Sequence, residues 1–585
     1  MIKASKKYLM WLVKYVVGLF PEKTRKHMRQ QLWLFNLYSR SLQKSGLFYG
    51  FPSPLKLQKL YCKAIVKQAI EMADICENKF ADEKLSTLVT LSGQVDADRN
   101  TLSSLITNSA VSAIYLQGQS ADVSRLLEEF SHSSTKELGA LDDLIKSENR
   151  DGLFVLRGGD ILHCAATKVF AFYAKRNDDK RIFYCDIDSI DCKGERHLAE
   201  FFPAWNPDLQ LTTGYIRTGV LIQKSTDIHN FLHFVIDNQD ASALALWLAD
   251  YYLREVKLSI EHIPLCLVHQ TFKYSLQWDR ELRKLNNEQF IVTKAEVIGL
   301  AKVEWYKETQ PLVSLVIPTK NAKNLVQMCI SSILSKTSYQ NFEILLIDNN
   351  SDDPEALAYF DKLVDSEDKV RLLRYPHEFN YSAINNFAVA HAKGEIVGLI
   401  NNDIEVISAN WLTDMVGHTL RADIGCVGAK LLYPDMRIQH AGVVMGYGGG
   451  AGHAHKYFPR YHPGYLNRLA VTNNFSAVTA ACLLVKKSDF DAVGGLNQDD
   501  LTVAFNDVDF CLRIRELGRQ NLYCAEAELF HHESISRGAD DTLEKRQRFE
   551  NELDYLQRKW PELIKNDPAY NPNLTLRFEN FSIRE

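Results

Sequence analysis

Short apolar runs alternate with helix-like segments between residues 311 and 400. Strand-like runs occur at Val313–Ile317, Phe342–Ile347 and Glu395–Ile400, and apolar residues recur at helical spacing in Leu325–Leu334 and Ala383–Ala392. Strands that alternate with helices in this way are typical of βαβ units. The pattern therefore predicts a parallel α/β sheet.

Polar residues follow each of the three predicted strands. Pro318 and Thr319 follow the first strand, Asp348 follows the second and Asp403 follows the third. Ligands of parallel α/β sheets bind at the carboxyl ends of the strands, so we expect these residues to share one edge of the sheet. The alternative for Asp348 and Asp403 is a local role in an Asx-turn or a helix cap.

The same alternation of strand-like and helix-like segments begins near residue 85, whereas the preceding residues read as helical. A charged stretch with little β character separates the two α/β regions. The predicted division is a helical segment at 1–80, an α/β domain at 81–275, a helical linker at 276–310, an α/β domain at 311–540 and a C-terminal helical extension at 541–585.

Apolar residues recur at helical spacing near the N-terminus, at Leu9, Leu12, Val13, Val16 and Phe20. Lys14 interrupts this run before it reaches the roughly 20 apolar residues of a membrane-spanning helix. Lysines and arginines lie on another face and continue to Arg29, which favours a basic amphipathic helix on an anionic membrane. The alternative is a helix that packs on its own protein and leaves its lysines in water.

Composition indicates which binding partners and which cellular compartment we expect. The 585 residues carry a formal net charge of -5, so no general attraction to nucleic acid is expected. The 11 cysteines include no CxxC pair, which favours reduced thiols in the cytoplasm over a disulfide framework.

Two acidic positions carry the best candidate chemistry. Asp403, at a strand end, suits Mg²⁺ or Mn²⁺, which prefer oxygen ligands and share their shell with substrate phosphates. Asp507 and Asp509 stand beside Asn506 at the start of a helix-like run. Either carboxylate could accept a proton from a sugar hydroxyl, although Asn506 or Asp507 could instead cap the helix.

Histidine and glycine clusters add two further candidates. A neutral imidazole of the pair His531 and His532 can ligate a divalent ion, although a lone histidine is more often structural. The glycine-rich stretch 446–452 lacks the strand and helix of a dinucleotide-binding loop. We expect this stretch to form a mobile loop near the substrate that accepts a transferred group.

Eight short sequence blocks, which occur in order within residues 311–540, together resemble glycosyltransferase family 2, which has the GT-A fold. The similarity is greatest to bacterial enzymes that build O-antigen, capsule and related surface polysaccharides. The blocks that carry the resemblance are Val316–Thr319, Ile347–Ser351, Leu399–Asp403, Gln439–Gly442, Ala477–Cys482, Gly494–Leu496, Asn506–Asp509 and His531–Ser534.

The resemblance implies an inverting, metal-dependent transfer of a hexosyl or deoxyhexosyl group from a nucleotide-diphosphate sugar to a glycan or lipid-linked glycan. It assigns Asp507 as the general base and Asp403 with His531 as metal ligands. Asn401 replaces the first carboxylate of the family's D-x-D signature. The implied donor-binding residues are Pro318, Thr319, Asp348 and Asn402.

A lipid-linked acceptor would place the protein in the cytoplasm, peripheral on the bacterial inner membrane. The alternative function is a non-catalytic sugar-binding or scaffold protein of a polysaccharide assembly complex. A processive membrane synthase is disfavoured, because the sequence shows no spanning helices and no Q-x-x-R-W motif.

Features of residues 81–275 repeat those of the later domain in the same order. Arg157-Gly158-Gly159-Asp160 follows a strand-like run as Asn401-Asn402-Asp403 does, and His269 parallels His531. Counting back from His269 by the interval that separates His531 from Asp507 reaches Ala245. We therefore expect a degenerate GT-A-like domain that performs no chemistry, the alternative being an unrelated α/β domain.

Overall fold

The computed structural model describes residues 54–585 apart from short gaps, together with Val16 and Phe20. The gaps fall at residues 78–84, 109, 132–136, 147–151, 178, 224, 239–241, 255–258, 273–276, 307–308 and 533–541. The predicted amphipathic helix at residues 1–30 lies almost wholly outside the described residues.

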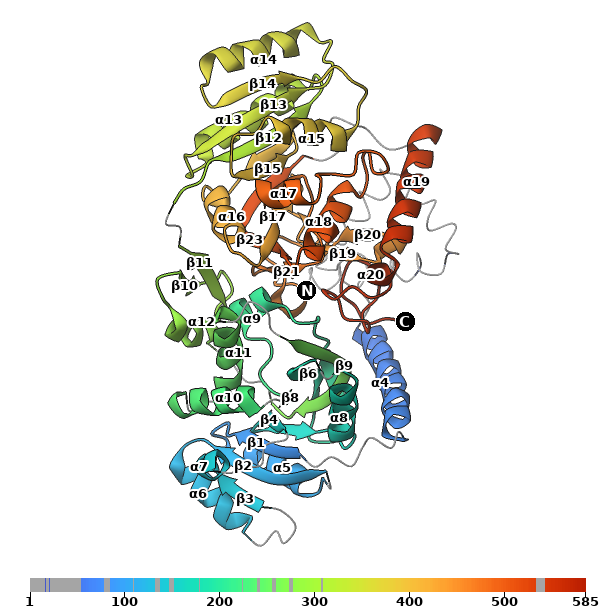
Figure 1. Ribbon diagram of the computed structural model, residues 1–585. Helices are drawn as coiled ribbons and strands as arrows, with labels where there is room; N and C mark the ends of the chain where they lie inside the picture. Colours follow the sequence, from blue (N-terminus) through green and yellow to red (C-terminus); the bar gives the residue numbers. More distant parts are fainter. Residues whose placement is uncertain are drawn as a thin grey trace, which may run out of the picture.

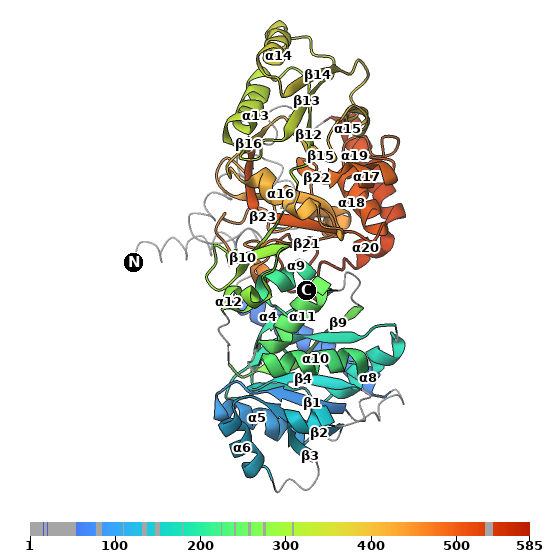
Figure 2. The ribbon, with the colours of Figure 1, turned by 60° about the vertical axis from the view of Figure 1, so that its left-hand side comes forward.

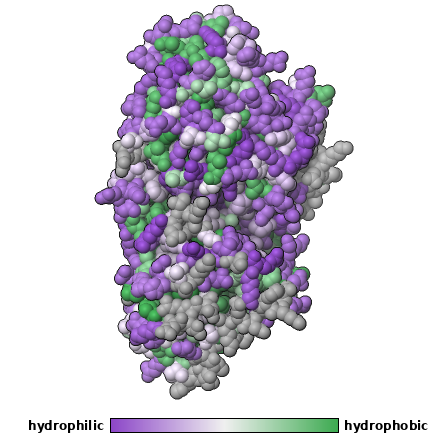
Figure 3. Space-filling model, viewed as in Figure 1, coloured by the Kyte–Doolittle hydropathy of each residue, from purple (hydrophilic) through white to green (hydrophobic). Residues whose placement is uncertain are grey.

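Two α/β domains are stacked end to end, with the C-terminal domain above the N-terminal one in Figures 1 and 2. The face seen in Figure 3 is mainly hydrophilic, with hydrophobic residues scattered among polar ones. None of the helices within the described residues is long and apolar enough to cross a membrane.

The C-terminal domain is built on a large mixed sheet. Its strands are β12 (Val313–Thr319), β13 (Phe342–Asp348), β14 (Val370–Arg374), β15 (Ile396–Ile400), β16 (Ile404–Val406), β17 (Ile424–Leu432), β18 (Ile438–His440), β21 (Asn473–Phe475), β22 (Cys482–Lys486) and β23 (Gln520–His531). The main order is β14-β13-β12-β15-β22-β17-β23-β16. Strands β12 to β15 pair in parallel, and β22 runs antiparallel to β15.

Helices cover both faces of this sheet, which explains the nearly continuous apolar runs of its strands. On β12, Val313, Leu315 and Ile317 enter one core and Val316 enters the other. The helices are α13 (Lys323–Lys336), α14 (Pro354–Ser366), α15 (Tyr381–Ala390), α16 (Trp411–Thr419), α17 (Lys487–Ala492), α18 (Asn506–Glu516), α19 (Leu543–Lys559) and α20 (Pro561–Lys565).

The N-terminal domain repeats this architecture. Its strands are β1 (Leu85–Thr90), β2 (Val111–Gln117), β3 (Glu137–Ala140), β4 (Leu153–Arg157), β5 (Asp160–Leu162), β6 (Ile182–Ile190), β7 (Arg196–Glu200), β8 (Val220–Ile222) and β9 (Ile260–Gln270). The order β3-β2-β1-β4-β8-β6-β9-β5 matches the C-terminal order position by position. Each neighbouring pair also has the same parallel or antiparallel sense.

The predicted α/β fold class, with a further GT-A-like domain before the C-terminal one, is therefore confirmed. Register supports the parallel between single residues, because Ile161 pairs with His269 as Ile404 pairs with His531. Asp160 and Asp403 each precede the paired isoleucine. The N-terminal helices are α4 (Pro54–Glu77), α5 (Val95–Ile106), α6 (Ser120–Glu129), α7 (Leu141–Lys146), α8 (Ala166–Arg176), α9 (Pro207–Thr213), α10 (Ser225–Asp237) and α11 (Ala243–Arg254).

The expectation of a helical linker with little strand at 276–310 is wrong for most of that segment. After α12 (Trp278–Leu282), an antiparallel hairpin forms from β10 (Phe290–Lys294) and β11 (Ala301–Trp305). Phe290, Val292 and Val303 are buried in a core shared with α9 and α11. Contacts with distant elements thus stabilise strands that the charged local sequence did not indicate.

Buried polar contacts join the two domains. Arg421 of the C-terminal domain forms ion pairs with Asp208, at 2.6 Å, and with Asp423, at 2.9 Å. The predicted C-terminal extension is helical only to Lys565, and its last 20 residues run between the domains without regular helix. Within them, Asn571 Nδ2 donates to both oxygens of Asp186, at 3.1 and 3.0 Å.

Candidate functional site

The carboxyl end of β12 meets two neighbouring strand ends. Thr319 is paired with Asp348 in the sheet register. Asn402, just beyond β15, donates through Nδ2 to Thr319 Oγ1 at 2.9 Å. Pro318 lies beside them and is partly exposed. The structure thus brings together the four residues assigned to the donor, at the edge where parallel sheets bind ligands.

Asp348 is held by its own surroundings. Only 3% exposed, it accepts a hydrogen bond from Ser351 N at 3.1 Å and another from Ser351 Oγ. Its other oxygen pairs with Arg374. The contact with Ser351 is the local turn role weighed as the alternative, and a contact with a nucleoside stays a prediction.

Asp403 and His531 lie together at the end of the sheet. His531 ends β23, opposite Ile404, and its Nε2 is 3.2 Å from Asp403 Oδ1. His532 points elsewhere, with its Nε2 3.1 Å from Glu405 Oε2. Of the two histidines, His531 is therefore the one beside the predicted metal ligand.

The chemistry of this pair fits a divalent ion. Asn401 Nδ2 lies 3.3 Å from His531 Nε2. The same nitrogen lies 3.2 Å from Asp403 Oδ1. A carboxylate oxygen and an imidazole nitrogen this close together can both bind one divalent ion. The described residues hold no cluster of three or more metal-binding side chains, but Mg²⁺ and Mn²⁺ need only one or two protein ligands when phosphates complete the shell.

Asp507 stands at the first turn of α18. It is not the helix cap, because Phe505 occupies that position in a left-handed conformation with φ 59°. Asp507 Oδ2 accepts from Ala480 N at 3.0 Å, and Oδ1 accepts from Val508 N at 2.9 Å. Burial raises the pKa of Asp507, and hydrogen bonds from Ala480 and Thr479 lower it by less. A raised carboxyl pKa suits a general base.

Asp509 has a structural role. It is fully buried and pairs with Arg513 at 2.7 Å and with Lys559 at 3.0 Å. Trp560 Nε1 donates to it at 2.9 Å. These contacts tie α18 to the end of α19 and leave Asp507 as the carboxylate available for chemistry.

Sequence reasoning missed the residue that joins the two carboxylate regions. Tyr381 Oη lies 3.2 Å from Asn401 Oδ1 and 3.2 Å from the carbonyl oxygen of Ala480. Ala480 in turn donates its N–H to Asp507. Tyr381 is an ordinary apolar position of α15 in the sequence, and no local signal marks it.

Two further histidines, the buried His440 and the half-buried His453, lie near His531. Their Nδ1 atoms, on His440 and His453, are 2.8 Å apart. Burial, together with the nearby His531, lowers the pKa of His440 to about 3. Burial lowers the pKa of His453 as well, so both rings are neutral at physiological pH. Gln439–Gly442 was one of the blocks in the resemblance, so His440 could have been found, whereas His453 directly follows the glycine-rich stretch and belongs to none of the blocks.

The chain is similar to known proteins over most of the region that carries this site. Residues 314–494 match the family described as Glycosyl transferase family 2. A protein of Sinorhizobium fredii, named "Uncharacterized protein y4gI", is 42% identical over 69% of this chain and 46% of its own length. The "O-antigen biosynthesis protein RfbC" of Myxococcus xanthus is 32% identical over 72% of this chain and 33% of its own length.

Solved structures with distant similarity include a mannosyltransferase from Pyrobaculum calidifontis in complex with GDP-Man and Mn²⁺. It is 16% identical, covers 43% of this chain and 65% of its own, and gives a TM-score of 0.32. GalNAc-T7 with UDP, GalNAc and Mn²⁺ is also 16% identical, covers 45% of this chain and 53% of its own, and gives a TM-score of 0.35.

The C-terminal domain of this chain belongs to glycosyltransferase family 2. The resemblance seen in the sequence is thereby confirmed, and so is the prediction of a glycosyltransferase at the level of this domain. The chain spans less than half the length of the two curated relatives.

Proposed function

We propose that the protein transfers a sugar, with inversion, from a nucleotide-diphosphate donor to a growing bacterial surface glycan or lipid-linked glycan. The observation that carries this proposal is the convergence of Asp403 and His531 with Asp507, linked through Asn401, Tyr381 and Ala480. The relative named for O-antigen biosynthesis supports the surface-glycan acceptor.

In this proposal Asp507 is the general base of a single displacement. The acceptor oxygen bonds to the anomeric carbon as the bond from that carbon to the diphosphate breaks, and the hydroxyl proton passes to the Asp507 carboxylate. The raised pKa of Asp507 brings its basicity closer to neutral pH. The N–H of Ala480 fixes the orientation of the carboxylate.

Donor binding is assigned to the edge formed by Pro318, Thr319, Asp348 and Asn402. Asp403 and His531 would hold Mg²⁺ or Mn²⁺, which offsets the charge on the departing diphosphate when bound. Asn401 supplies no carboxylate here. Instead, its amide orients the His531 ring.

The N-terminal domain is proposed to do no chemistry. Asp160, the counterpart of Asp403, is fully buried in an ion pair with Arg157 at 3.1 Å. The helix that corresponds to α18 is α11, where Ala245 is buried in the core. Tyr61 of α4 donates to Asp188, which also binds His269 at 2.6 Å. Side chains from outside the sheet thus occupy the counterpart of the catalytic edge, and this domain would position acceptor or partner.

A cytoplasmic protein peripheral on the inner membrane is also proposed. Helix α4 packs against α8 through its buried side. Its outer face exposes Val66 and Ile70, each 61% exposed, beside Lys59, Lys63 and Lys67. A face that combines apolar side chains with lysines suits an anionic lipid surface, and it supports the same prediction made for residues 1–30.

Donor turnover tests the proposed function. The purified full chain is incubated with a panel of nucleotide-diphosphate sugars and either Mg²⁺ or Mn²⁺, and release of the nucleoside diphosphate is measured. We expect slow hydrolysis of one donor that stops in excess chelator and returns when metal is added back. Release of no nucleotide from any donor would favour the non-catalytic scaffold, and undiminished release in chelator would refute the metal-dependent mechanism.

A further inference from the structure

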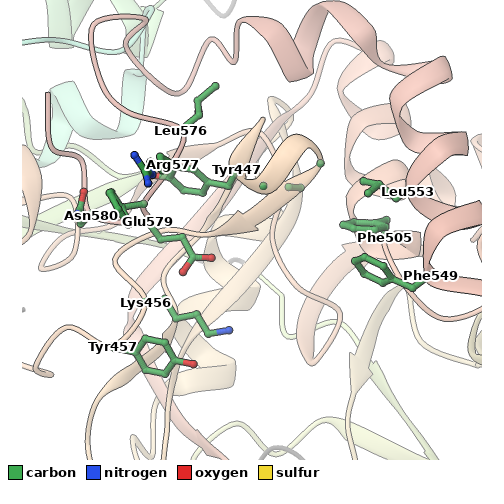
Figure 4. A pocket seen from close by; sticks show the side chains of 14 residues that line it. Tyr447, Lys456, Tyr457, Phe505, Phe549, Leu553, Leu576, Arg577, Glu579 and Asn580 are labelled. Atoms are coloured by element: carbon green, nitrogen blue, oxygen red, sulfur yellow. The ribbon is translucent and has the colours of Figure 1, made fainter. Parts of the chain in front are cut away.

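A pocket of about 370 Å³ lies beside the catalytic helix, at the junction of three segments (Figure 4). One wall comes from Phe505 with Phe549 and Leu553 of α19. The other comes from Tyr457 and from Glu579 of the C-terminal segment. We propose that this pocket binds a sugar ring of the glycan acceptor and so sets acceptor specificity. This inference rests on the proposed transfer reaction and names the second substrate's site.

The pocket is connected along the chain to the proposed base Asp507 on one side and to the surroundings of His531 on the other. Phe505 precedes Asp507 by two residues and turns the chain into α18. On the other side, Ala451 lines the pocket and begins β20 (Ala451–His453), whose His453 contacts His440 near His531. The pocket lining is thus joined through the backbone to the helix that carries the proposed base, and none of the residues assigned to the donor lines the pocket.

The glycine-rich stretch acquires a physical role in this pocket. An added Cβ at Gly450 would come 2.6 Å from Leu553 and 3.5 Å from Phe505, and one at Gly452 would come 2.9 Å from Glu579 Oε1. Glycine at these two positions lets the loop approach both walls. The stretch 446–452 is thus a short turn and hairpin packed into the pocket wall, formed by η2 (Tyr447–Gly449) and β20 with β19 (Val443–Met445).

The two walls match the two kinds of surface on a sugar ring. Figure 4 shows the rings of Phe505 and Phe549 on one side of the cavity, and the Glu579 carboxylate on the other side pointing toward Lys456. Aromatic faces pack against the C–H face of a ring, while charged groups bind its hydroxyls. The volume is within the range of about 300–1,000 Å³ that is usual for small-ligand sites.

Glu579 contributes a partly buried carboxylate to the pocket. It lies in a segment outside the family match at 314–494, and burial raises its pKa while Lys456 opposes the change. The same C-terminal segment binds the N-terminal domain through Asn571. The proposed acceptor pocket therefore combines residues of the matched family segment, such as Lys456 and Tyr457, with residues of the C-terminal segment outside it.

The test uses two pocket variants, Phe549→Ala and Glu579→Gln, and the control Tyr461→Ala. Tyr461 is 72% exposed and does not line the pocket. The probe is an array of bacterial surface-polysaccharide oligosaccharides, read with labelled full-length protein. We expect wild type and the control to bind at least one glycan, and both pocket variants to bind it about tenfold more weakly or worse. Unchanged Tm in all variants excludes misfolding.

Donor hydrolysis and nucleotide affinity separate this proposal from the transfer reaction. Both should be unchanged in the pocket variants, because neither residue touches the donor edge. Loss of glycan binding in the variants of a protein that hydrolyses no donor would keep the pocket and refute the transfer. Glycan binding that is absent from wild type, or equal in all variants, would overturn the pocket assignment.

Discussion

At the residue scale, their surroundings give two neighbouring carboxylates different properties. Asp507 and Asp509 are two residues apart. Burial raises the pKa of Asp507, the proposed base, which accepts hydrogen bonds from two backbone N–H groups, while Arg513 and Lys559 neutralise Asp509. The sequence predicted both carboxylates as candidates. Only the family resemblance assigned Asp507. The local pattern could not separate the two, because their difference depends on Lys559 and Trp560 at the end of α19, about 50 residues away along the chain.

Asp507→Asn should reduce transfer by about 100- to 10,000-fold, the usual loss when a general base is removed. The amide oxygen can still accept the hydrogen bond from Ala480, so donor affinity should be nearly unchanged. Burial raises the pKa of Asp507 in the folded protein, so its ionised form destabilises the fold above that pKa. The neutral variant should therefore keep or raise the Tm at neutral pH.

The raised pKa also predicts the pH profile. The base must be ionised, so kcat/KM should fall toward acid, with a midpoint above the usual Asp value of 3.8. Rates at saturating metal, measured across pH, check this limb. Near-normal transfer by Asp507→Asn, or an acid limb at or below the ordinary value, would remove Asp507 from the role of base.

At the element scale, the parallel strands and their polar ends could be predicted because each strand carries its own apolar run. The hairpin at 290–305 could not, since its core partners come from α9 and α11. Tyr381 and His453 were missed for a similar reason, because their contacts with Ala480 and His440 depend on how distant elements pack.

Helix α4 carries the element-scale prediction. Exchange of Lys59, Lys63 and Lys67 for Gln should weaken binding to phosphatidylglycerol vesicles by about 100-fold, since each lysine near an anionic surface contributes about 1 kcal/mol. Sedimentation of the full chain with vesicles measures this. The control exchanges three exposed lysines elsewhere, Lys284, Lys362 and Lys393. Equal binding by both triple variants, or binding insensitive to high salt, would exclude α4 as a membrane contact.

At the scale of the whole molecule, two sheets of the same topology differ in the side chains at the end of the sheet. One keeps Asp403 and His531 side by side at the end of the sheet. In the other, Asp160 forms an ion pair with Arg157, and Tyr61 and Asn571 occupy the corresponding region. The C-terminal segment contacts both domains, so in the proposed function the N-terminal domain supports the acceptor pocket without a reaction of its own. A repeated topology could be inferred from the order of motifs, but the filled edge required the structure.

The number of nucleotide sites per chain tests this account most directly. Titration calorimetry of the full chain with UDP, GDP and dTDP in the presence of Mn²⁺ should show one site for the preferred nucleotide. Asp403→Ala should abolish it. The double variant Arg157→Met with Asp160→Leu removes both partners of the N-terminal ion pair, which is often tolerated, and it should keep the site and donor turnover. Two sites per chain, or a site that survives Asp403→Ala and disappears in the double variant, would contradict the account.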